Sequence, residues 1–199
     1  MEKSTGVSIS TIEPEMDYDV GCIRMSRTKP EYWSRLGSSK NRTHEQENLG
    51  KETIMDIMME APQECTFAFT DGSCLTNPGP TGAGAVLYTP GGDAIRLKRA
   101  VTKHGTILLA ELVAVLMVLE EILQHPHLTP GNIIQIFSDS QTVVGILTMG
   151  WKNNGHRSVI EEIKKALRTL SMTTTVQLLL TSGHAGLQGN EVADGLAKE

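Results

Sequence analysis

Hydrophobic and polar residues change their spacing several times along the chain, and each spacing predicts an element. Between residues 66 and 101, short apolar stretches alternate with turns rich in glycine and proline, which is typical of strands in an antiparallel meander. An unbroken apolar run is typical of a central buried strand, and one follows later in the chain. The predicted strands are a first one that ends at Asp71, and then 82–88, 94–101, 132–138 and 175–181.

Apolar residues with the spacing of an amphipathic helix follow the meander. The strongest helical pattern covers residues 108–123, with Leu112, Val115 and Leu119 on its buried stripe. Other helices are predicted over 141–149, 159–170 and 190–198, the last with Asn190 as its N-cap. The order βββαβααβα predicts the α/β class, with a five-stranded mixed sheet in which the meander is followed by parallel strands, and with helices on both faces.

The N-terminal part of the chain lacks sustained periodicity of either kind. Polar clusters dominate up to about residue 50, although residues 45–61 could form a short helix with Ile54 among its apolar positions. We therefore expect residues 1–64 to be an irregular arm or the remnant of an upstream domain, and 65–199 to be the folded domain. Removal of residues 1–60 is expected to leave the melting transition nearly unchanged.

Composition and charge narrow the function classes. The formal net charge of −5 argues against nucleic-acid binding by bulk electrostatics, so any polyanion must be held locally or through metal ions. No apolar run is long enough to span a bilayer, and the first twenty residues are polar and acidic, so we expect no membrane anchor and no secretory signal. Cys22, Cys65 and Cys74 match no disulfide framework, which fits a reducing intracellular compartment, nucleus or cytoplasm.

Two acidic residues stand where the pattern predicts burial. Asp71 shares a strand face with Phe67 and Phe69, and an ionised carboxylate there costs several kcal/mol or more unless it is paired. Its other interpretation is an aspartate that opens a turn after the strand. Glu111 lies at the N-terminal end of a largely apolar helix face, where it could instead complement the helix dipole for at most ~1 kcal/mol.

Two further acids complete a candidate metal site. Asp139 follows the predicted central strand, and Asp194 lies on the last helix, three residues after Glu191. A cluster made only of carboxylates suits Mg²⁺ or Mn²⁺ better than zinc. Two such ions ~4 Å apart can hold the attacking water and the leaving oxygen of a phosphodiester in line. We therefore expect two Mg²⁺ ions as cofactors, with Mn²⁺ as a substitute.

Four sequence blocks carry a resemblance to a known family. They are Thr70–Pro80 (TDGSCLTNPGP), Ala110–Leu112 (AEL), Ser138–Gln141 (SDSQ) and Gly183–Lys198 (GHAGLQGNEVADGLAK). In this order and spacing they resemble the signature blocks of type 1 ribonuclease H, and the resemblance extends from about Thr66 to the end of the chain. It implies the ribonuclease H-like fold and endonucleolytic cleavage of the RNA strand of RNA/DNA hybrids, which leaves 5′-phosphate and 3′-hydroxyl ends.

The resemblance also implies a role for particular residues. It makes Asp71, Glu111, Asp139 and Asp194 the four metal-binding carboxylates, with Asp71 bridging the two ions. It assigns His184, in the glycine-rich loop after the last strand, to proton transfer or product departure. Without the match, a loop histidine would more often be an exposed side chain with no such role.

Substrate contacts and departures from the family pattern follow from the same resemblance. Asn77 and Thr106 fall where the family contacts the hybrid backbone, and Gln141 falls where it reaches the minor groove. The chain has Ile107-Leu-Leu109 where cellular enzymes usually have two asparagines just upstream of the glutamate, and it lacks a long basic insertion. These departures, with the acidic arm, look more like a retroelement ribonuclease H domain that follows a reverse transcriptase domain.

Two other functions compete with this hypothesis. The same fold hosts DNA-cutting resolvases and integrase-like enzymes, which the block around His184 disfavours. A non-catalytic module that binds hybrids or a partner protein is the second alternative. Intact acids at all four positions argue against it, because a binding surface has no need for mutually repelling charges.

Overall fold

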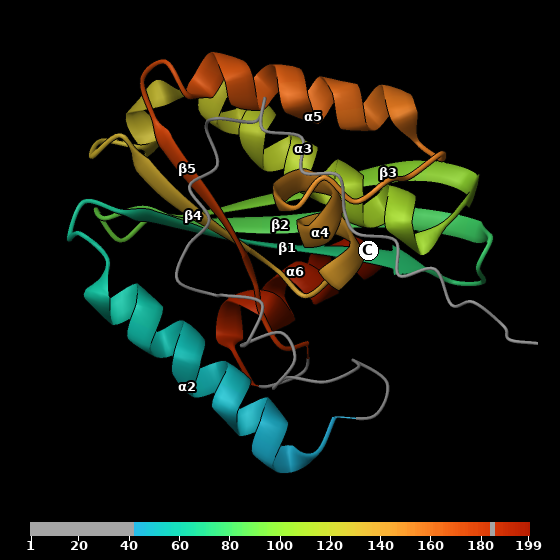
Figure 1. Ribbon diagram of the computed structural model, residues 1–199, viewed down its shortest axis with the longest axis horizontal. Coiled ribbons are helices and arrows are strands. Elements are labelled where there is room, and N and C mark those ends of the chain that lie inside the picture. Colours follow the sequence, from blue (N-terminus) through green and yellow to red (C-terminus); the bar gives the residue numbers. More distant parts are fainter. Residues whose placement is uncertain (1–41, 184–185) are drawn as a thin grey trace, which may run out of the picture.

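A five-stranded sheet forms the centre of the protein in the computed structural model, which describes residues 42–183 and 186–199 (Figure 1). The strands are β1 Thr66–Cys74, β2 Gly79–Tyr88, β3 Ala94–Gly105, β4 Ile133–Ser138 and β5 Thr175–Leu180. The helices are α2 His44–Glu60, α3 Ile107–Gln124, α4 Gln141–Thr148, α5 Arg157–Leu170 and α6 Gln188–Lys198, with a 3₁₀ turn η1 at Pro126–Leu128. None of the described helices combines the length and the apolar character that crossing a membrane requires.

The sheet is mixed, as the order of the elements predicts. Its strand order is β3-β2-β1-β4-β5, in which β1, β2 and β3 pair antiparallel. Strand β4 pairs parallel with β1 on one side and with β5 on the other. The predicted α/β class, the meander followed by parallel strands and the helices on both faces are therefore confirmed.

The two faces of the sheet bury different side chains. Helices α3, α4 and α5 cover one face, and α2 and α6 lie on the other (Figure 1). The first face buries what we call the aliphatic core, which includes Leu119, Ile136 and Ile163. The second buries what we call the aromatic cluster, in which the rings of Phe69 and Phe137 stack with centroids 4.9 Å apart. The aromatic cluster consists of Ile54, Phe69, Val86, Phe137, Leu179, Leu187 and Ala193.

Several element boundaries differ from the prediction, among them those that concern Asp71 and Asn190. Strand β1 does not end at Asp71 but continues to Cys74, because β2 continues opposite it and places Gly84 against Asp71. Helix α6 begins at Gln188 with Leu187 at its N-cap position, so Asn190 is not the cap. Asn190 is instead buried within the first turn, where the close approach of α6 to the sheet leaves it no access to solvent.

The segment before the sheet is more ordered than the prediction of an irregular arm. Helix α2 starts with a capping box, in which Thr43 and Gln46 satisfy each other's backbone N–H groups. The predicted short helix over 45–61 is thus confirmed, but the expectation of an arm outside the core does not hold for it, since Ile54 is fully buried. The part of the arm before residue 42 lies outside the described residues.

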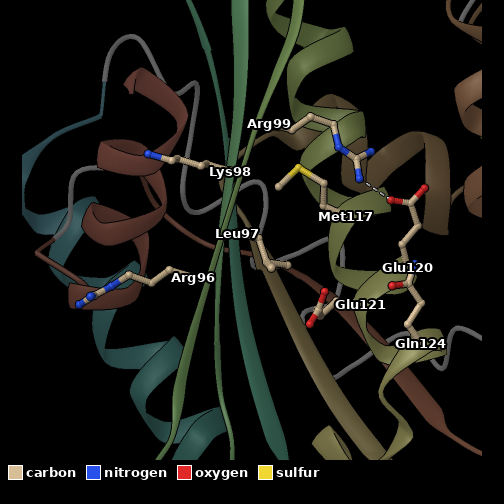
Figure 2. A pocket seen from close by; sticks show the side chains of 8 residues that line it. All are labelled: Arg96, Leu97, Lys98, Arg99, Met117, Glu120, Glu121 and Gln124. Atoms are coloured by element: carbon tan, nitrogen blue, oxygen red, sulfur yellow. Dashed lines mark hydrogen bonds and ion pairs between the residues drawn. The ribbon is translucent and has the colours of Figure 1, made fainter.

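A pocket of about 340 Å³ lies between β3 and α3 (Figure 2). Arg99 of β3 crosses it to pair with Glu120 of α3, with 2.6 Å between Nη2 and Oε2. None of the predicted metal ligands Asp71, Glu111 and Asp139 lines this pocket. Its exposed ion pair ties the edge strand to the helix and marks no separate site.

Candidate active site

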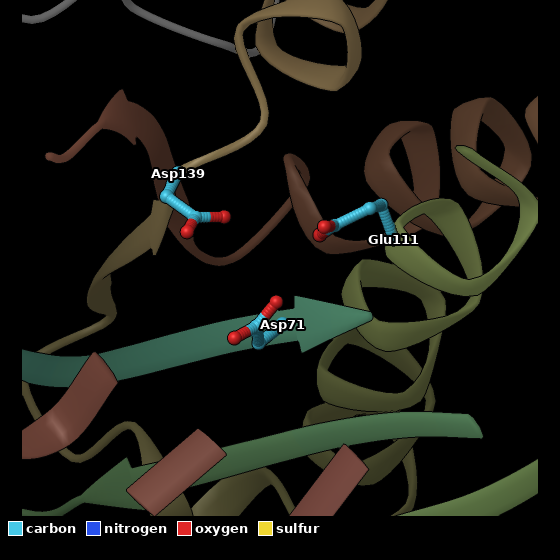
Figure 3. Close-up of side chains that lie close together, drawn as sticks. All are labelled: Asp71, Glu111 and Asp139. Atoms are coloured by element: carbon cyan, nitrogen blue, oxygen red, sulfur yellow. The ribbon is translucent and has the colours of Figure 1, made fainter. Parts of the chain in front are cut away.

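Three carboxylates from separate elements meet where β1 and β4 approach the start of α3 (Figure 3). Asp71 comes from β1, Glu111 from α3, and Asp139 directly follows β4. One carboxylate oxygen of each lies within 4.8 Å of the others. The structure therefore brings together three of the four acids that the sequence predicts as metal ligands.

A glycine next to Asp71 lets the strand and the helix approach closely. A Cβ atom at Gly72 would lie 2.6 Å from the backbone nitrogen of Glu111, which no real side chain tolerates. The N–H of Gly72 donates a hydrogen bond of 2.7 Å to Oδ1 of Asp71. The Asp-Gly pair thus fixes one carboxylate and leaves room for the next.

Glu111 lies one turn into α3, on the side of the helix that faces the sheet. Thr106 caps this helix, since its Oγ1 accepts a hydrogen bond from the N–H of Leu109. Glu111 is only 6% exposed, and its Oε2 accepts no hydrogen bond from the described residues. A buried carboxylate oxygen without a donor costs free energy, and a cation at this point would remove that cost.

Asp139 lies between the end of β4 and Gly183, which comes three residues after the end of β5. A Cβ atom at Gly183 would lie 2.5 Å from Oδ2 of Asp139, so a larger residue would displace the carboxylate. The parallel pairing of β4 with β5 brings these two chain segments to the same edge of the sheet. That edge, at the carboxyl ends of parallel strands, is where open α/β sheets bind ligands.

Burial and the charges of neighbouring acids raise the pKa of Asp71 and of Glu111. Burial, followed by the charges of Asp139 and Asp194, raises the pKa of Asp71 to about 8. Burial, followed by the charges of Asp139 and Asp71, raises the pKa of Glu111 well above its usual range. Oxygen ligands, negative charge and an orphan Glu111 oxygen fit a hard divalent cation such as Mg²⁺ or Mn²⁺.

Asp194 stands apart from the other three carboxylates. Its Oδ2 accepts a hydrogen bond of 2.6 Å from Nζ of Lys198, one turn further along α6. It is still close enough for its charge to raise the pKa of Asp71, while the Lys198 ammonium lowers it. Sequence reasoning missed Lys198, although its spacing of four residues from Asp194 is the signal of a helical ion pair.

The predicted substrate-binding residues flank the carboxylates. Oδ1 of Asn77 accepts a hydrogen bond of 3.3 Å from the N–H of Ile107, and Thr106 Oγ1 lies 2.9 Å from Nε2 of His156. Both contacts lie at the start of α3, one turn before Glu111. Gln141 begins α4, two residues after Asp139. His156 has no sequence signal that points to this contact.

The predicted catalytic His184 lies outside the described residues. Of the residues on either side of it that are described, Gly183 lies beside Asp139 and Gly186 lies near Lys51 of α2. The role of His184 stays a prediction, as do the roles of the other site residues.

The fold and the acidic site define a class, an α/β protein with carboxylates clustered near the carboxyl ends of two interior strands of a mixed sheet. The RNase H family model matches residues 63–199, which contain all five strands and all three clustered carboxylates. The chain belongs to the RNase H family.

Known relatives agree with this assignment. The chain is 36% identical over 146 residues to a ribonuclease H of Dinoroseobacter shibae. This match covers 67% of this chain and 88% of that protein. The chain is also 32% identical over 151 residues to a ribonuclease H of Rhodopseudomonas palustris. That match covers 71% of this chain and 92% of the relative.

A solved structure agrees as well. The crystal structure of a type 1 RNase H from the archaeon Halobacterium salinarum has a TM-score of 0.52 and 26% identity to this chain. The match covers 68% of this chain and 96% of the archaeal one. The shared part is therefore a nearly complete domain of the relative, whereas this chain has residues beyond it.

Proposed function

We propose that the protein is a divalent-metal-dependent endonuclease that hydrolyses the RNA strand of RNA/DNA hybrids. The observation that carries this proposal is the cluster of Asp71, Glu111 and Asp139, in which one oxygen of each lies within 4.8 Å of the others and the first two residues are buried. Relatives of the same family that are named ribonuclease H support the choice of substrate. A hard cation would relieve the repulsion that raises the pKa of Asp71.

The four carboxylates are proposed to hold the metal. Asp71, Glu111 and Asp139 would be its nearest ligands. Asp194 would join them once its carboxylate exchanges the hydrogen bond from Lys198 for a contact with the metal. A bound pair of Mg²⁺ ions, or of Mn²⁺ ions in their place, supplies the chemistry of phosphodiester hydrolysis by stabilising the attacking water and the leaving oxygen. The burial of Asp71 and Glu111 limits the access of bulk water to that chemistry.

The residues around the cluster are proposed to hold the hybrid and to move a proton. Asn77 and Thr106 lie at the start of α3, where they would contact the backbone of the hybrid, and Gln141 would reach its minor groove. Contacts of this kind read groove shape and the 2′-hydroxyl rather than the base sequence. His184 would assist proton transfer or product departure.

The retroelement origin stays a prediction. It rests on the departures from the cellular pattern and on the few basic residues between α4 and the end of α5, whereas the relatives named above are two bacterial ribonucleases H and an archaeal one. Since few phosphates would be neutralised by side chains, the isolated domain should bind hybrids weakly and with a shallow salt dependence. An upstream reverse transcriptase domain would then supply affinity.

Cleavage of an end-labelled RNA strand tests the proposed function. The substrate is an RNA/DNA hybrid with Mg²⁺ or Mn²⁺, and a DNA duplex of the same sequence is the control. Asp139→Asn should abolish cleavage, while Asp93→Asn, at an exposed turn far from the cluster, should cleave like the wild type. Wild-type protein that folds and binds the hybrid without cutting it would contradict the proposal and favour the binding module.

A further inference from the structure

Helix α2 precedes the part of the chain that the RNase H family model matches, yet it belongs to the interior of the protein. The family match begins at residue 63, and α2 ends at Glu60. Within this helix Gly50 is buried and Ile54 is fully buried. Burial of the whole Ile54 side chain stabilises the packing of α2 against the rest of the fold.

The partners of Ile54 lie on the strands and on α6. Ile54 shares the aromatic cluster with Phe137 of β4 and Leu179 of β5, and also with Ala193 of α6. Ile57 and Met58, half-buried on the same side of α2, pack against this cluster. Helices α2 and α6 therefore cover one face of the sheet together (Figure 1).

Helix α6 is fixed to the sheet on one side by backbone contacts. Gly82 and Gly84 of β2 have no room for a Cβ atom, because the backbone of α6 occupies that space. Oγ of Ser73 donates a hydrogen bond of 2.5 Å to the carbonyl oxygen of Ala197. The other side of α6 depends on the aromatic cluster, which buries Leu187 and Ala193.

Helix α2 also reaches the connection that precedes α6. Lys51 lies one turn before Ile54 on the inner face of α2, and its Nζ would be 3.4 Å from a Cβ atom at Gly186. Gly186 lies in the segment between β5 and α6, directly before Leu187. One helix thus contacts both the entry to α6 and the cluster on which α6 rests.

We propose that α2 is a positioning element of the active site. It packs against the start of α6 and thereby determines the position of Asp194 relative to Asp71, Glu111 and Asp139. Ala193, which shares the cluster with Ile54, is the immediate neighbour of Asp194. This inference rests on the proposed function, in which Asp194 is a metal ligand. Residues that orient a metal ligand without binding the metal themselves commonly lower metal affinity on the order of tenfold or more when they are mutated.

A matched pair of variants separates positioning from plain loss of stability. Ile54→Ala removes the α2 side chain that packs in the aromatic cluster with Leu187 and Ala193. Ile163→Ala makes the same change at an equally buried isoleucine of α5 in the aliphatic core. Mn²⁺ binding is measured by titration calorimetry, at a temperature where melting curves show that both variants are folded. We expect Ile54→Ala to bind Mn²⁺ about tenfold more weakly than the wild type, and Ile163→Ala to match the wild type.

Further variants test the same contacts from other positions. Leu187→Ala should weaken Mn²⁺ binding as Ile54→Ala does, because it removes a side chain at the start of α6 from the same aromatic cluster. If the alanine variants do not fold, Ile54→Val and Ile163→Val repeat the comparison with a smaller change. Lys51→Met tests the contact with the connection, with Mn²⁺ affinity as the readout.

The outcomes distinguish this inference from the proposed function. Equal Mn²⁺ affinities for Ile54→Ala and Ile163→Ala, whether both normal or both weakened, would overturn the positioning role of α2. Wild-type protein that binds no Mn²⁺, or binds it as well after Asp139→Asn, would instead overturn the proposed metal site.

Discussion

The aliphatic core and the carboxylate cluster are both buried, but burial acts on them in opposite ways. In the aliphatic core, removal of Leu119, Ile136 and Ile163 from water lowers the free energy of the folded state. In the carboxylate cluster, the same removal from water raises the pKa of Asp71 to about 8 and that of Glu111 well above its usual range. The core therefore stabilises the fold, whereas the cluster is held in place at the expense of stability, as expected of a site built for a cation.

The largest effect should come from neutralising the most buried acid. Glu111→Gln keeps the shape of the side chain but removes its charge, so cleavage of a hybrid should fall by at least about a thousandfold. The same variant should unfold at a higher temperature than the metal-free wild type, because it removes a buried carboxyl group whose ionisation burial and the charges of Asp139 and Asp71 oppose. Cleavage assays and thermal melting measure the two effects.

The control for this variant is Glu162→Gln, at an exposed position of α5. It should change neither cleavage nor melting. Normal cleavage by Glu111→Gln would show that the cluster is not the site of the reaction.

A cavity in the aliphatic core should show the reverse pattern. Leu119→Ala empties a fully buried position of α3, two turns after Glu111, and should lower the free energy of unfolding by about 2–5 kcal/mol. Leu123→Ala, on the same helix but 37% exposed, should lower it by less than ~1 kcal/mol. Urea unfolding measures both values, and Mn²⁺ affinity should be unchanged in each. Weakened metal binding by Leu119→Ala would break the separation between the two regions.

The pH dependence of stability should reveal the cluster without any metal. The folded protein holds the Asp71 proton up to about pH 8, whereas an unfolded aspartate releases it near pH ~4. The stabilisation is therefore fully present below the unfolded pKa, and it is lost as the pH rises through the folded pKa. Metal-free wild type should thus lose melting temperature relative to Asp71→Asn between about pH 4 and pH 8. A constant difference between the two proteins across this window would contradict the raised pKa.

The cap of α3 should contribute a smaller amount. Thr106→Ala removes the hydroxyl that accepts from Leu109 and contacts His156, and it should lower the free energy of unfolding by about 1 kcal/mol. Thr106→Ser keeps the hydroxyl and should restore most of that loss. Denaturant unfolding of the two variants checks the prediction, and equal losses would show that the cap contributes nothing.

The exposed ion pair between β3 and α3 should have the smallest effect. Arg99 and Glu120 are about half and one-third exposed, so solvent screens their attraction (Figure 2). Arg99→Ala, Glu120→Ala and the double variant should each lie within ~1 kcal/mol of the wild type. A coupling energy above that range in the double-mutant cycle would show that the edge strand depends on this pair.

Much of the fold follows from local patterns in the sequence. The alternation of Phe67 and Phe69 and the helical spacing within 108–123 predict a strand and a helix that the structure contains, although β1 is buried on both faces and α3 is buried nearly all round. The predicted positions of Asp71, Glu111 and Asp139, each at or near the end of an element, also predict that their carboxylates can meet. These features depend on residues that are close together in the chain.

Features that depend on distant partners were not predictable. The pattern of α2 permits a helix, but the burial of Ile54 depends on Phe137 and Leu179, which lie more than eighty residues later. The continuation of β1 past Asp71 depends on β2, where Gly82 and Gly84 leave room for α6. The burial of Ile54 argues against the expectation that residues 1–60 are dispensable for stability, which stays a prediction that the melting curve of a truncated protein tests.

Anomalous diffraction from crystals soaked in Mn²⁺ tests the proposed metal site most directly. The account predicts an anomalous peak bound by oxygens of Asp71, Glu111 and Asp139, with Asp194 turned from Lys198 toward a second ion. The peak should vanish in crystals of Asp139→Asn and persist in crystals of Asp93→Asn. Mn²⁺ bound elsewhere, with none among these carboxylates, would contradict the account.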